Sequence, residues 1–478
     1  MATLYDEVLY PNNAYPQTHP LRLSALATLM GAPSAPFQTC RVLEAACGDG
    51  ANLFGMALAA PRASFVGLDL AEAPIRRGQG VVKGLGLTNL RLETRDLREP
   101  GHDLGEFDYL IAHGVYAWVP ASVRQALMAL AGRVLSPAGL AFISYNAMPG
   151  GRVRQILRDL LLGGLRDFQG DTAGRVGVAR ALLQQFVEQW SAEDPLQKAL
   201  AGEARRMLKR AEAVLFHDEL SEVYEPQYLT DVVELAADHG LAYLCDAQPE
   251  NADSAPDATE GLSAQHRLRA EQLADFLRPK FFRASVFQRA GAGQAADGAD
   301  WRALRGLHGH APLKPARPKT GEPGAEAFAT PAEQSFETAH PRMIGLLHAL
   351  ADAHPGSVAL EPWLTDDTVG SGVLRLFRSG VLTLLSEPFQ FARVPGDRPR
   401  ASPLARWQAL QGLTELTGLD QSTVRITDGE ALRFITLLDG EQDRASLARR
   451  MFGDVASEHL AFIEARLADL AGIALLSA

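Results

Sequence analysis

VLEAACGDGANL, residues 42–53, is a short apolar run that leads through a glycine turn into the start of a helical pattern. Such a run is typical of a buried parallel strand followed by a helix. Gly48 and Gly50 stand in the turn, where glycine permits a positive φ and a close approach of the backbone to a ligand. A helix that begins near Ala51 adds free N–H groups toward an anionic ligand group. We therefore expect a ligand crevice at the carboxyl end of this strand.

Outward from this turn, short β-rich runs alternate with helical patterns, which is the signature of parallel strands joined by crossover helices. The helical segment 121–139 ends at a predicted turn, the SPAG of residues 136–139. Residues 161–215 are helical throughout, and the alternation resumes after them. Strands are expected at 41–46, 64–69, 90–96, 107–114, 139–146, 241–247 and 281–289. The sequence thus predicts an α/β fold, with a Rossmann-like sheet of these strands around a helical insert.

Shifts in composition mark the end of this sheet domain. Segments 290–300 and 314–334 are rich in Gly, Ala and Pro, as in a domain linker. Beyond them, two helical units each close on a short apolar run after Gly380 or Gly472, which suggests winged-helix-like modules; simple helical packing domains are the alternative. The expected division is a split α/β domain in residues 1–160 and 216–290, a helical insert in 161–215, a linker in 291–335, a middle helical domain in 336–395 and a C-terminal helical or winged-helix-like domain in 396–478.

The overall composition excludes several classes of protein. At 478 residues and 47% apolar content, the chain can form several packed domains. Its formal net charge of -11 would repel a phosphate backbone, so nucleic acid is not an expected partner. The three cysteines form no CxxC pair and no cluster with metal-ligand spacing, so we expect no metal and a cytoplasmic location. No leader pattern and no apolar run of membrane-spanning length occurs, so membrane insertion is not expected.

Acidic residues follow the next two strands at the edge where the ligand would lie. Asp69 ends the second strand, where a carboxylate can accept both hydroxyls of a ribose. Asp96 ends the third strand, where a carboxylate or backbone group can bind an adenine amino group while Leu70 and Leu97 cover the ring. Each acid alone could be a helix cap or a turn residue. Together with the glycine turn, in this order and spacing, they indicate an adenosine-containing cofactor.

The same stretch distinguishes between two adenosine cofactors. A nicotinamide dinucleotide site requires GxGxxG, and here Leu53 stands where the third glycine would be. S-adenosylmethionine fits better, with its carboxylate at the helix N-terminus and its ribose on Asp69. The sequence therefore predicts S-adenosylmethionine as the cofactor.

The motifs resemble those of class I S-adenosylmethionine-dependent methyltransferases that carry a methyltransferase regulatory domain, and among these the rickettsial protein-lysine methyltransferases that act on outer-membrane proteins. Two departures are visible: Ala45 and Ala46 replace the Leu-Gly that is more usual in the family, and Gly151 replaces an aromatic residue. The resemblance rests on YPQTHP (15–20), residues 41–53, GEFDY (105–109), AHGVYAWVP (112–120), SYN (144–146), MPG (148–150), FHDEL (216–220), DFLR (275–278) and LLDG (437–440).

This resemblance implies a sheet with an antiparallel last strand, a helical dimerisation insert and a C-terminal region that shapes access for a protein substrate. It implies an enzyme that methylates protein lysine by in-line transfer. The expected partners are then a second copy of the chain, in a homodimer, and a protein substrate, which could be an outer-membrane protein.

The acceptor pocket of methyltransferases with this fold follows the fourth strand, which here ends near His113. Methyl transfer is an in-line displacement, so the protein chiefly positions the two partners and excludes water. A desolvated, aromatic pocket favours the neutral form of a lysine acceptor, and Tyr or Asn oxygens can accept its remaining hydrogens. The candidate catalytic residues are Tyr116, Trp118, Tyr145 and Asn146. Trp118 and Tyr145 could instead be core aromatics.

A segment rich in Tyr and Pro precedes the first strand, and it is either a lid or an inert arm. In the related enzymes it folds over the cofactor, which implies that Gln17 and His19 meet the methionine carboxylate. His217 and Asp218 are expected to be structural. The expected cofactor-binding residues are Gln17, His19, Glu44, Ala46, Gly48, Asn52, Asp69, Leu70, Asp96, Leu97, His113 and Gly114.

Two further functions stay open. A small-molecule N- or O-methyltransferase could use the same cofactor domain, with the additional domains serving assembly. A non-catalytic regulator could bind S-adenosylmethionine and change the contacts of its C-terminal modules. A protein methyltransferase is preferred, because the helical and C-terminal additions exceed what a small-molecule enzyme requires.

Overall fold

The computed structural model describes residues 4–478 except 100–101, 192, 249–263, 293–299 and 320. Its centre is a seven-stranded sheet with the strand order β3-β2-β1-β4-β5-β7-β6, in which β7 is antiparallel to both of its neighbours. The strands are β1 Arg41–Ala45, β2 Ser64–Asp69, β3 Leu90–Thr94, β4 Phe107–Ala112, β5 Leu135–Asn146, β6 Leu241–Asp246 and β7 Phe282–Arg289. The predicted α/β fold and its antiparallel last strand are confirmed.

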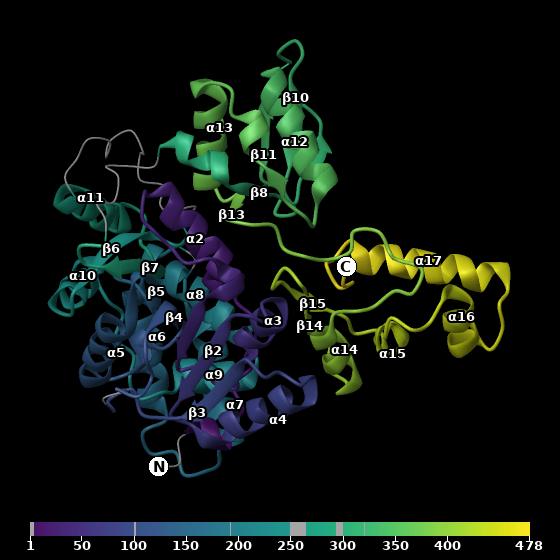
Figure 1. Ribbon diagram of the computed structural model, residues 1–478. Coiled ribbons are helices and arrows are strands. Elements are labelled where there is room, and N and C mark those ends of the chain that lie inside the picture. Colours follow the sequence, from purple (N-terminus) through teal and green to yellow (C-terminus); the bar gives the residue numbers. More distant parts are fainter. Residues whose placement is uncertain (1–3, 100–101, 192, 249–263, 293–299, 320) are drawn as a thin grey trace.

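The glycine turn after β1 has the positive φ values that its glycines predict. β1 pairs in parallel with β2 on one side and β4 on the other, and all of its residues after Arg41 are buried. Gly48 and Gly50 have φ values of 59° and 79°, so both need glycine. Helices pack on both faces of the sheet (Figure 1). They are α2 Pro20–Leu29, α3 Ala51–Ala59, α4 Glu72–Leu85, α5 Ala121–Val134, α10 Leu229–Asp238 and α11 Ala264–Leu277.

One predicted boundary is wrong, at the SPAG of residues 136–139. Strand β5 already begins at Leu135, directly after α5, so these residues lie inside the strand. Leu135 pairs with Phe107, and the register then shifts, so the additional residues form a bulge. Ser136 is buried there and donates a hydrogen bond to Asp108 at 2.9 Å. Pairing with a neighbouring strand therefore overrides the local turn signal of Pro and Gly.

The helical insert begins before residue 161, because its first helix starts at Gly151. Its helices share a core of their own, separate from the two cores on the faces of the sheet. The insert helices are α6 Gly151–Gly164, α7 Thr172–Gln189, α8 Pro195–Leu208 and α9 Glu212–Glu219.

The predicted linker, residues 291–335, contains regular structure in its described part, so the middle domain begins earlier and is not purely helical. Strand β8 pairs with β12 and β13, and β9, β10 and β11 form a second small sheet. These strands are too short for a periodic pattern to reveal them. The elements are a 3-10 helix at Trp301–Gly306, β8 His308–His310, β9 Lys314–Ala316, β10 Glu326–Ala329, β11 Ser335–Thr338, α12 Pro341–Ala353, β12 Val358–Ala359, α13 Asp367–Arg378 and β13 Thr383–Leu385.

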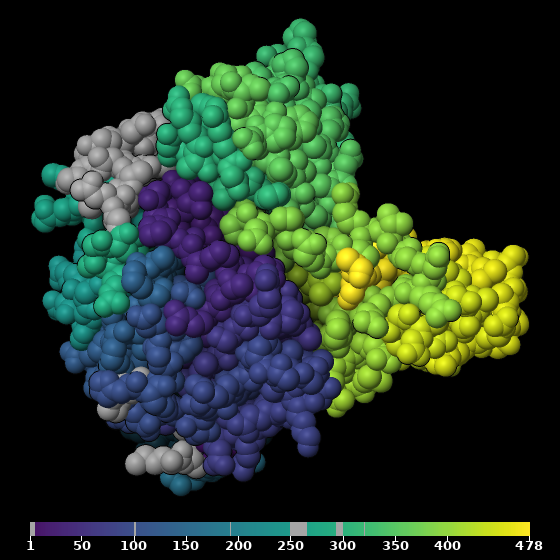
Figure 2. All heavy atoms as spheres, viewed as in Figure 1, coloured from purple at the N-terminus to yellow at the C-terminus, as the bar shows by residue number. Residues whose placement is uncertain are grey.

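The C-terminal part projects to one side of the large body in Figure 2 and docks on helices α3 and α4. Two glycines allow this docking: a Cβ on Gly84 would lie 2.8 Å from Trp407 Nε1, and one on Gly55 would lie 2.3 Å from Gln421 Nε2. The run after Gly472 forms only an isolated bridge, not the expected strand. The elements are α14 Pro403–Leu410, β14 Glu415–Thr417, β15 Thr423–Arg425, α15 Gly429–Leu437, α16 Arg444–Phe452 and α17 Ser457–Ala471.

Candidate functional site

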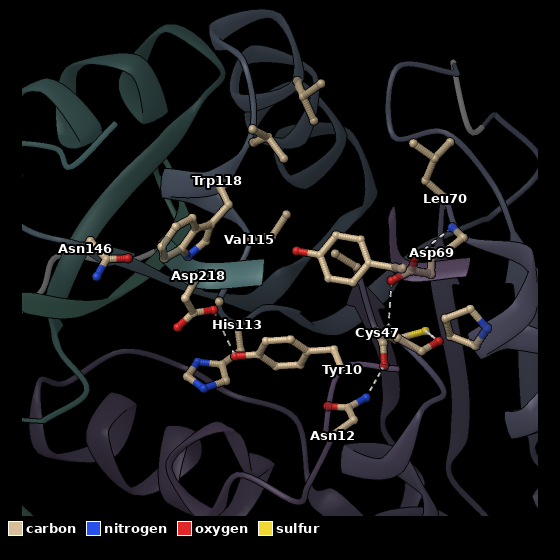
Figure 3. A pocket seen from close by; sticks show the side chains of 18 of the residues that line it. Tyr10, Asn12, Cys47, Asp69, Leu70, His113, Val115, Trp118, Asn146 and Asp218 are labelled. Carbon is tan, nitrogen blue, oxygen red and sulfur yellow. Dashed lines mark hydrogen bonds between the residues drawn. The ribbon is translucent and has the colours of Figure 1, made fainter. Parts of the chain in front are cut away.

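A cavity of about 1030 Å³ lies at the carboxyl ends of β1, β2, β3 and β4 (Figure 3). Its wall combines this edge of the sheet with the N-terminal segment, the loop after β4 and the helical insert. The predicted site residues that line it are Glu44, Ala46, Gly48, Asp69, Leu70, Asp96, Leu97, His113, Gly114, Trp118 and Asn146. The sheet topology therefore brings most of the predicted residues to one place.

Two of the four predicted catalytic residues lie elsewhere. Tyr116 and Tyr145 are each 1% exposed and belong to the core on one face of the sheet. The Tyr145 hydroxyl lies 3.0 Å from Ser285 Oγ, on the neighbouring strand β7. Both side chains point away from the cavity because of their position in the strand and turn, which the residue type alone does not reveal. Trp118 and Asn146 do line the cavity.

Gln17 and His19, which the resemblance assigned to the methionine carboxylate, also lie outside the cavity wall. His19 is fully buried and caps α2, accepting the Leu21 N–H at 3.1 Å through Nδ1. Its ring packs between Phe37 and Phe389, at centroid distances of 4.5 and 5.0 Å. Burial lowers the pKa of His19 to about 3. This histidine is a neutral structural residue, and Gln17 lies in the 3-10 turn before it.

The glycine turn is closed by Asp69, which accepts two backbone hydrogen bonds. Its Oδ2 accepts the Gly48 N–H and its Oδ1 the Ala71 N–H, both at 2.8 Å. Asn12 fastens the other side of the turn by donating to the Cys47 carbonyl at 2.9 Å. A carboxylate oxygen has more than one lone pair, so Asp69 can still accept hydrogen bonds from the hydroxyl groups of a ligand.

Glu44 is a buried carboxyl group on the cavity wall. Its Oε1 accepts a hydrogen bond from Asn52 Nδ2 at 2.8 Å, whereas its buried Oε2 has no partner among the described residues. Burial raises the pKa of Glu44 to about 8. A buried polar atom without a partner calls for a ligand that brings a donor or a positive charge. Asn52 itself stands behind Glu44 and does not line the cavity, contrary to its predicted role.

Asp96, at the end of β3, is paired with Arg98, which was not predicted and also lines the cavity. Arg98 Nη2 lies 2.5 Å from Asp96 Oδ2, and its backbone N–H donates to Oδ1 at 2.9 Å. The hydrogen bonds from Arg98 lower the pKa of Asp96. Asp96 is therefore a fixed, charged group. With Glu44 and Asp69 it forms a row of acids at this edge of the sheet.

The N-terminal segment forms one wall of the cavity through Tyr5, Tyr10, Asn12 and Tyr15. His217 anchors this segment to helix α9: Tyr5 stacks on its ring at 4.2 Å between centroids, and its Nε2 lies 2.8 Å from the Val8 carbonyl oxygen. The segment is thus built into the fold as a covering wall, which favours a lid over an inert arm.

The other end of the cavity is aromatic and charged. The Trp118 and Tyr224 rings lie 4.9 Å apart, and the Arg154 guanidinium group lies 5.0 Å from the centre of the Trp118 ring. His113, after β4, is neutral because burial lowers its pKa to about 4. Asp218 reaches this end from helix α9, so it is part of the site and not only structural as expected.

Gly151, where the resemblance leads one to expect an aromatic residue, lies next to Tyr224, which lines this end of the cavity. A Cβ on Gly151 would lie 2.5 Å from Pro226 Cβ and 3.4 Å from the Tyr224 hydroxyl. No larger side chain fits at this position, and Pro226 and Tyr224 fill the space instead. Tyr224 is thus an aromatic group of the cavity wall next to Gly151.

Sequence reasoning missed Arg154, Glu203 and Arg206 of the insert, and Tyr224, which follows the last insert helix. They lie far along the chain from the glycine turn, and only the three-dimensional fold joins them to it. Their one local signal was the FHDEL stretch at 216–220, which ends beside Tyr224 in the sequence. In the described part of the chain, no group of three or more His, Cys, Asp and Glu side chains is placed to hold a metal ion. No helix among the described residues is long and apolar enough to cross a membrane.

Family models match three parts of the chain. Residues 42–139 match "Methyltransferase domain", 211–289 match "Predicted methyltransferase regulatory domain", and 397–474 match "PKMT, C-terminal winged helix domain". This chain carries a class I methyltransferase domain. For the C-terminal of the two units, this match confirms a winged helix over simple helical packing.

Two uncharacterized proteins of Rickettsia prowazekii (strain Madrid E) are similar to this chain. One is 33% identical over 287 residues, which are 59% of this chain and 52% of the relative. The other is 29% identical over 234 residues, which are 48% of this chain and 93% of the relative. The chain thus spans about half the length of the first relative.

PKMT2 from Rickettsia typhi has a similar fold, with a TM-score of 0.82 at 20% identity, over 98% of this chain and 99% of that one. The structure of PKMT2 in complex with AdoHcy gives a TM-score of 0.83. The chain shares with PKMT2 the fold of the whole molecule, C-terminal domain included.

Proposed function

We propose that this chain is a methyltransferase that transfers the methyl group of S-adenosylmethionine to the side-chain amino group of lysine in a protein. PKMT abbreviates protein-lysine methyltransferase, and the chain shares the PKMT fold and winged-helix domain. These likenesses concern the fold and the domains, and the support for the activity comes from the residues of the cavity.

One observation carries the proposal: a single cavity contains both the row of acids at the sheet edge and an aromatic end. Asp69 and Asp96 at the sheet edge line the same cavity as Trp118 and Phe282. Its volume of about 1030 Å³ is at the upper end for ligand pockets, which is enough for a cofactor and the end of a lysine side chain. An in-line transfer requires such a shared chamber, since both partners must meet inside it.

The residues at the sheet edge fit S-adenosylmethionine. Gly48 keeps the turn free of a side chain, since a Cβ there would lie 2.7 Å from Asn12 Nδ2 and would displace Asn12 from the turn. Asp69 would accept the ribose hydroxyls, and the orphaned Oε2 of Glu44 would face the positively charged amino-acid end. The cofactor supplies an activated methyl group on a sulfonium. The chain orients it, excludes water, and keeps the acceptor amine neutral at the aromatic end.

Labelled transfer tests the proposal. The enzyme is incubated with methyl-tritiated S-adenosylmethionine and bacterial cell-envelope and cytosolic proteins, which are then hydrolysed and analysed for methyl-lysine. We expect methyl-lysine with the natural chain, none with Asp69→Asn, and unchanged amounts with Asp238→Asn, an exposed aspartate at the end of α10. Label confined to small molecules would support a small-molecule methyltransferase instead. Cofactor binding without any transfer would support a non-catalytic regulator.

We further propose that the helical insert joins two copies of the chain. Ile156 on α6 and Leu196 on α8 are 44% and 59% exposed, which suits a helix-to-helix contact. Light scattering should give twice the monomer mass for the natural chain and the monomer mass for Ile156→Asp; a monomeric natural chain would contradict this. The cytoplasmic location and an outer-membrane substrate stay predictions.

A further inference from the structure

We infer that Tyr10 is a catalytic residue whose hydroxyl, held by Asp218, accepts a hydrogen bond from the acceptor amine and so directs the nitrogen lone pair at the methyl group. The inference rests on the proposed function. Tyr10 supplies the hydrogen-bond acceptor for the amine that Tyr116 and Tyr145 were expected to supply. It also narrows the acceptor to a group with an N–H bond.

Contacts with one carboxylate fix the direction of the Tyr10 hydroxyl. It donates to Asp218 Oδ1 at 3.3 Å, which Figure 3 shows as a dashed line inside the cavity. The second oxygen, Oδ2, accepts from Arg154 Nη2 at 3.2 Å and from Arg210 Nη1 at 2.9 Å. Both arginines also bind the buried Glu219, so Asp218 is held by an ionic network and cannot turn freely.

This arrangement leaves the Tyr10 oxygen as an acceptor. A hydroxyl has one proton, and Tyr10 donates it to Asp218; no group of the described residues donates to the oxygen, so its lone pairs can accept from an N–H donor. Burial, together with the charge of Asp218, raises the pKa of Tyr10, which keeps the hydroxyl protonated at neutral pH.

The position of Tyr10 suits the acceptor rather than the cofactor. Asp218, which accepts a hydrogen bond from the Tyr10 hydroxyl, also accepts from Arg154, whose guanidinium group lies 5.0 Å from the centre of the Trp118 ring. The neutral amine, having lost its proton to solvent, uses its lone pair to form the new N–C bond while the sulfur–methyl bond breaks. When one N–H of the amine donates a hydrogen bond to the Tyr10 oxygen, the amine is oriented with its lone pair toward the methyl group, along the line of attack.

The Tyr10 hydroxyl belongs to the N-terminal segment, so the position of this segment decides whether the acceptor end is complete. The segment that covers the cavity also completes the acceptor end, because His217 and Asp218 hold it through Tyr5, Val8 and Tyr10. The acceptor site is therefore complete only when the segment is in place.

The test compares Tyr10→Phe with the natural chain and with Tyr228→Phe, which removes a hydroxyl outside the cavity where Tyr228 stacks on Phe276. Cofactor affinity is measured by calorimetry with S-adenosylhomocysteine, and kcat by methyl-lysine formation on cell-envelope proteins. We expect Tyr10→Phe to lower kcat by about tenfold, the effect of one lost hydrogen bond, with a cofactor Kd within about twofold of the natural chain. Tyr228→Phe should match the natural chain in both.

Asp218→Asn is the second variant, since Asp218 is a positioning residue. It should lower kcat more than it raises KM for the protein acceptor, and combined with Tyr10→Phe it should add little. An unchanged kcat in Tyr10→Phe, or a loss matched by an equal loss of cofactor affinity, would overturn the inference. If the natural chain forms no methyl-lysine, the proposed function fails, and the inference fails with it. If the natural chain and Tyr10→Phe form methyl-lysine at the same rate, only the inference fails.

Discussion

Asn52 donates a hydrogen bond from its side-chain amide to the buried carboxyl group of Glu44, with 2.8 Å between Nδ2 and Oε1. The Oδ1 of the same amide accepts the backbone N–H of Tyr15 at 2.8 Å. One side chain on α3 thereby connects β1 with the N-terminal segment. The acid on the cavity wall and the segment that covers the cavity are aligned by the same residue.

Replacing Asn52 with Leu should weaken both connections. We expect the affinity for S-adenosylhomocysteine to fall by about tenfold and the free energy of unfolding by about 1–3 kcal/mol, because Glu44 loses its side-chain partner. Calorimetry and urea unfolding measure the two effects. Asn89→Ala is the control: Asn89 donates to three carbonyl oxygens at the end of α3, so its loss should lower stability without changing affinity. Unchanged affinity in Asn52→Leu would contradict the assignment.

A methyl group at Gly48 should damage the cofactor site more than the fold. Gly48 has a φ of 59°, and an added Cβ would lie 2.7 Å from Asn12 Nδ2. Gly48→Ala should therefore lower the free energy of unfolding by about 1–2 kcal/mol and cofactor affinity by at least about tenfold. Gly80→Ala, in the exposed middle of α4 with open space around its Cβ, should instead raise stability by about 0.5–1 kcal/mol. A natural affinity in Gly48→Ala would argue against a ligand at this turn.

The buried His19 makes stability depend on pH. Its pKa is about 3 in the folded protein, below the value of about 6.5 for an unfolded chain, so the unfolded state binds an additional proton between these values. The free energy of unfolding should fall as the pH is lowered from about 6.5, with a contribution of at most about 1.4 kcal/mol per pH unit.

Urea unfolding between pH 4.5 and 7 checks this effect. His19→Asn keeps an acceptor for the first turn of α2 and should reduce the slope, whereas His102→Asn, at an exposed site, should leave it unchanged. Equal slopes in all three chains would show that His19 is not the group responsible.

The docking of the winged-helix domain should depend on Gly84. A Cβ at this position meets the indole nitrogen of Trp407 at 2.8 Å, so Gly84→Leu should push α14 away from α4 at a cost of about 1–3 kcal/mol. Hydrogen exchange in α14 and limited proteolysis after residue 386 should both increase. Gly80→Leu on the same helix has open space and should change neither. Unaltered protection of α14 in Gly84→Leu would mean that Trp407 does not hold the domain in place.

The sequence predicted the sheet and the cofactor edge well, because both depend on local patterns. Buried parallel strands are apolar runs, and the groups at their carboxyl ends meet at one edge whatever the rest of the fold does. Glu44, Gly48 and Asp69 could be placed for this reason. Short strands such as β8 and β14 could not, because three residues carry no measurable period.

The acceptor end was harder to predict because distant parts of the chain build it. Tyr116 and Tyr145 were chosen for chemistry and nearness in sequence to β4 and β5, but both point into the core. Tyr10 and Asp218 are 208 positions apart, and only the folding of the insert onto the N-terminal segment brings them together. Residue type and spacing cannot reveal such a contact.

The antiparallel strand β7 also matters for the chain during its synthesis. The long strand β5 leaves the ribosome with one edge unpaired, and the insert and β6 must follow before Phe282 begins the strand that pairs with it. Until then the nascent polypeptide presents a row of free backbone groups to its neighbours, which is a template for aggregation. Any fragment truncated before Phe282 inherits this exposed edge, and its recovery from cells should depend on chaperones.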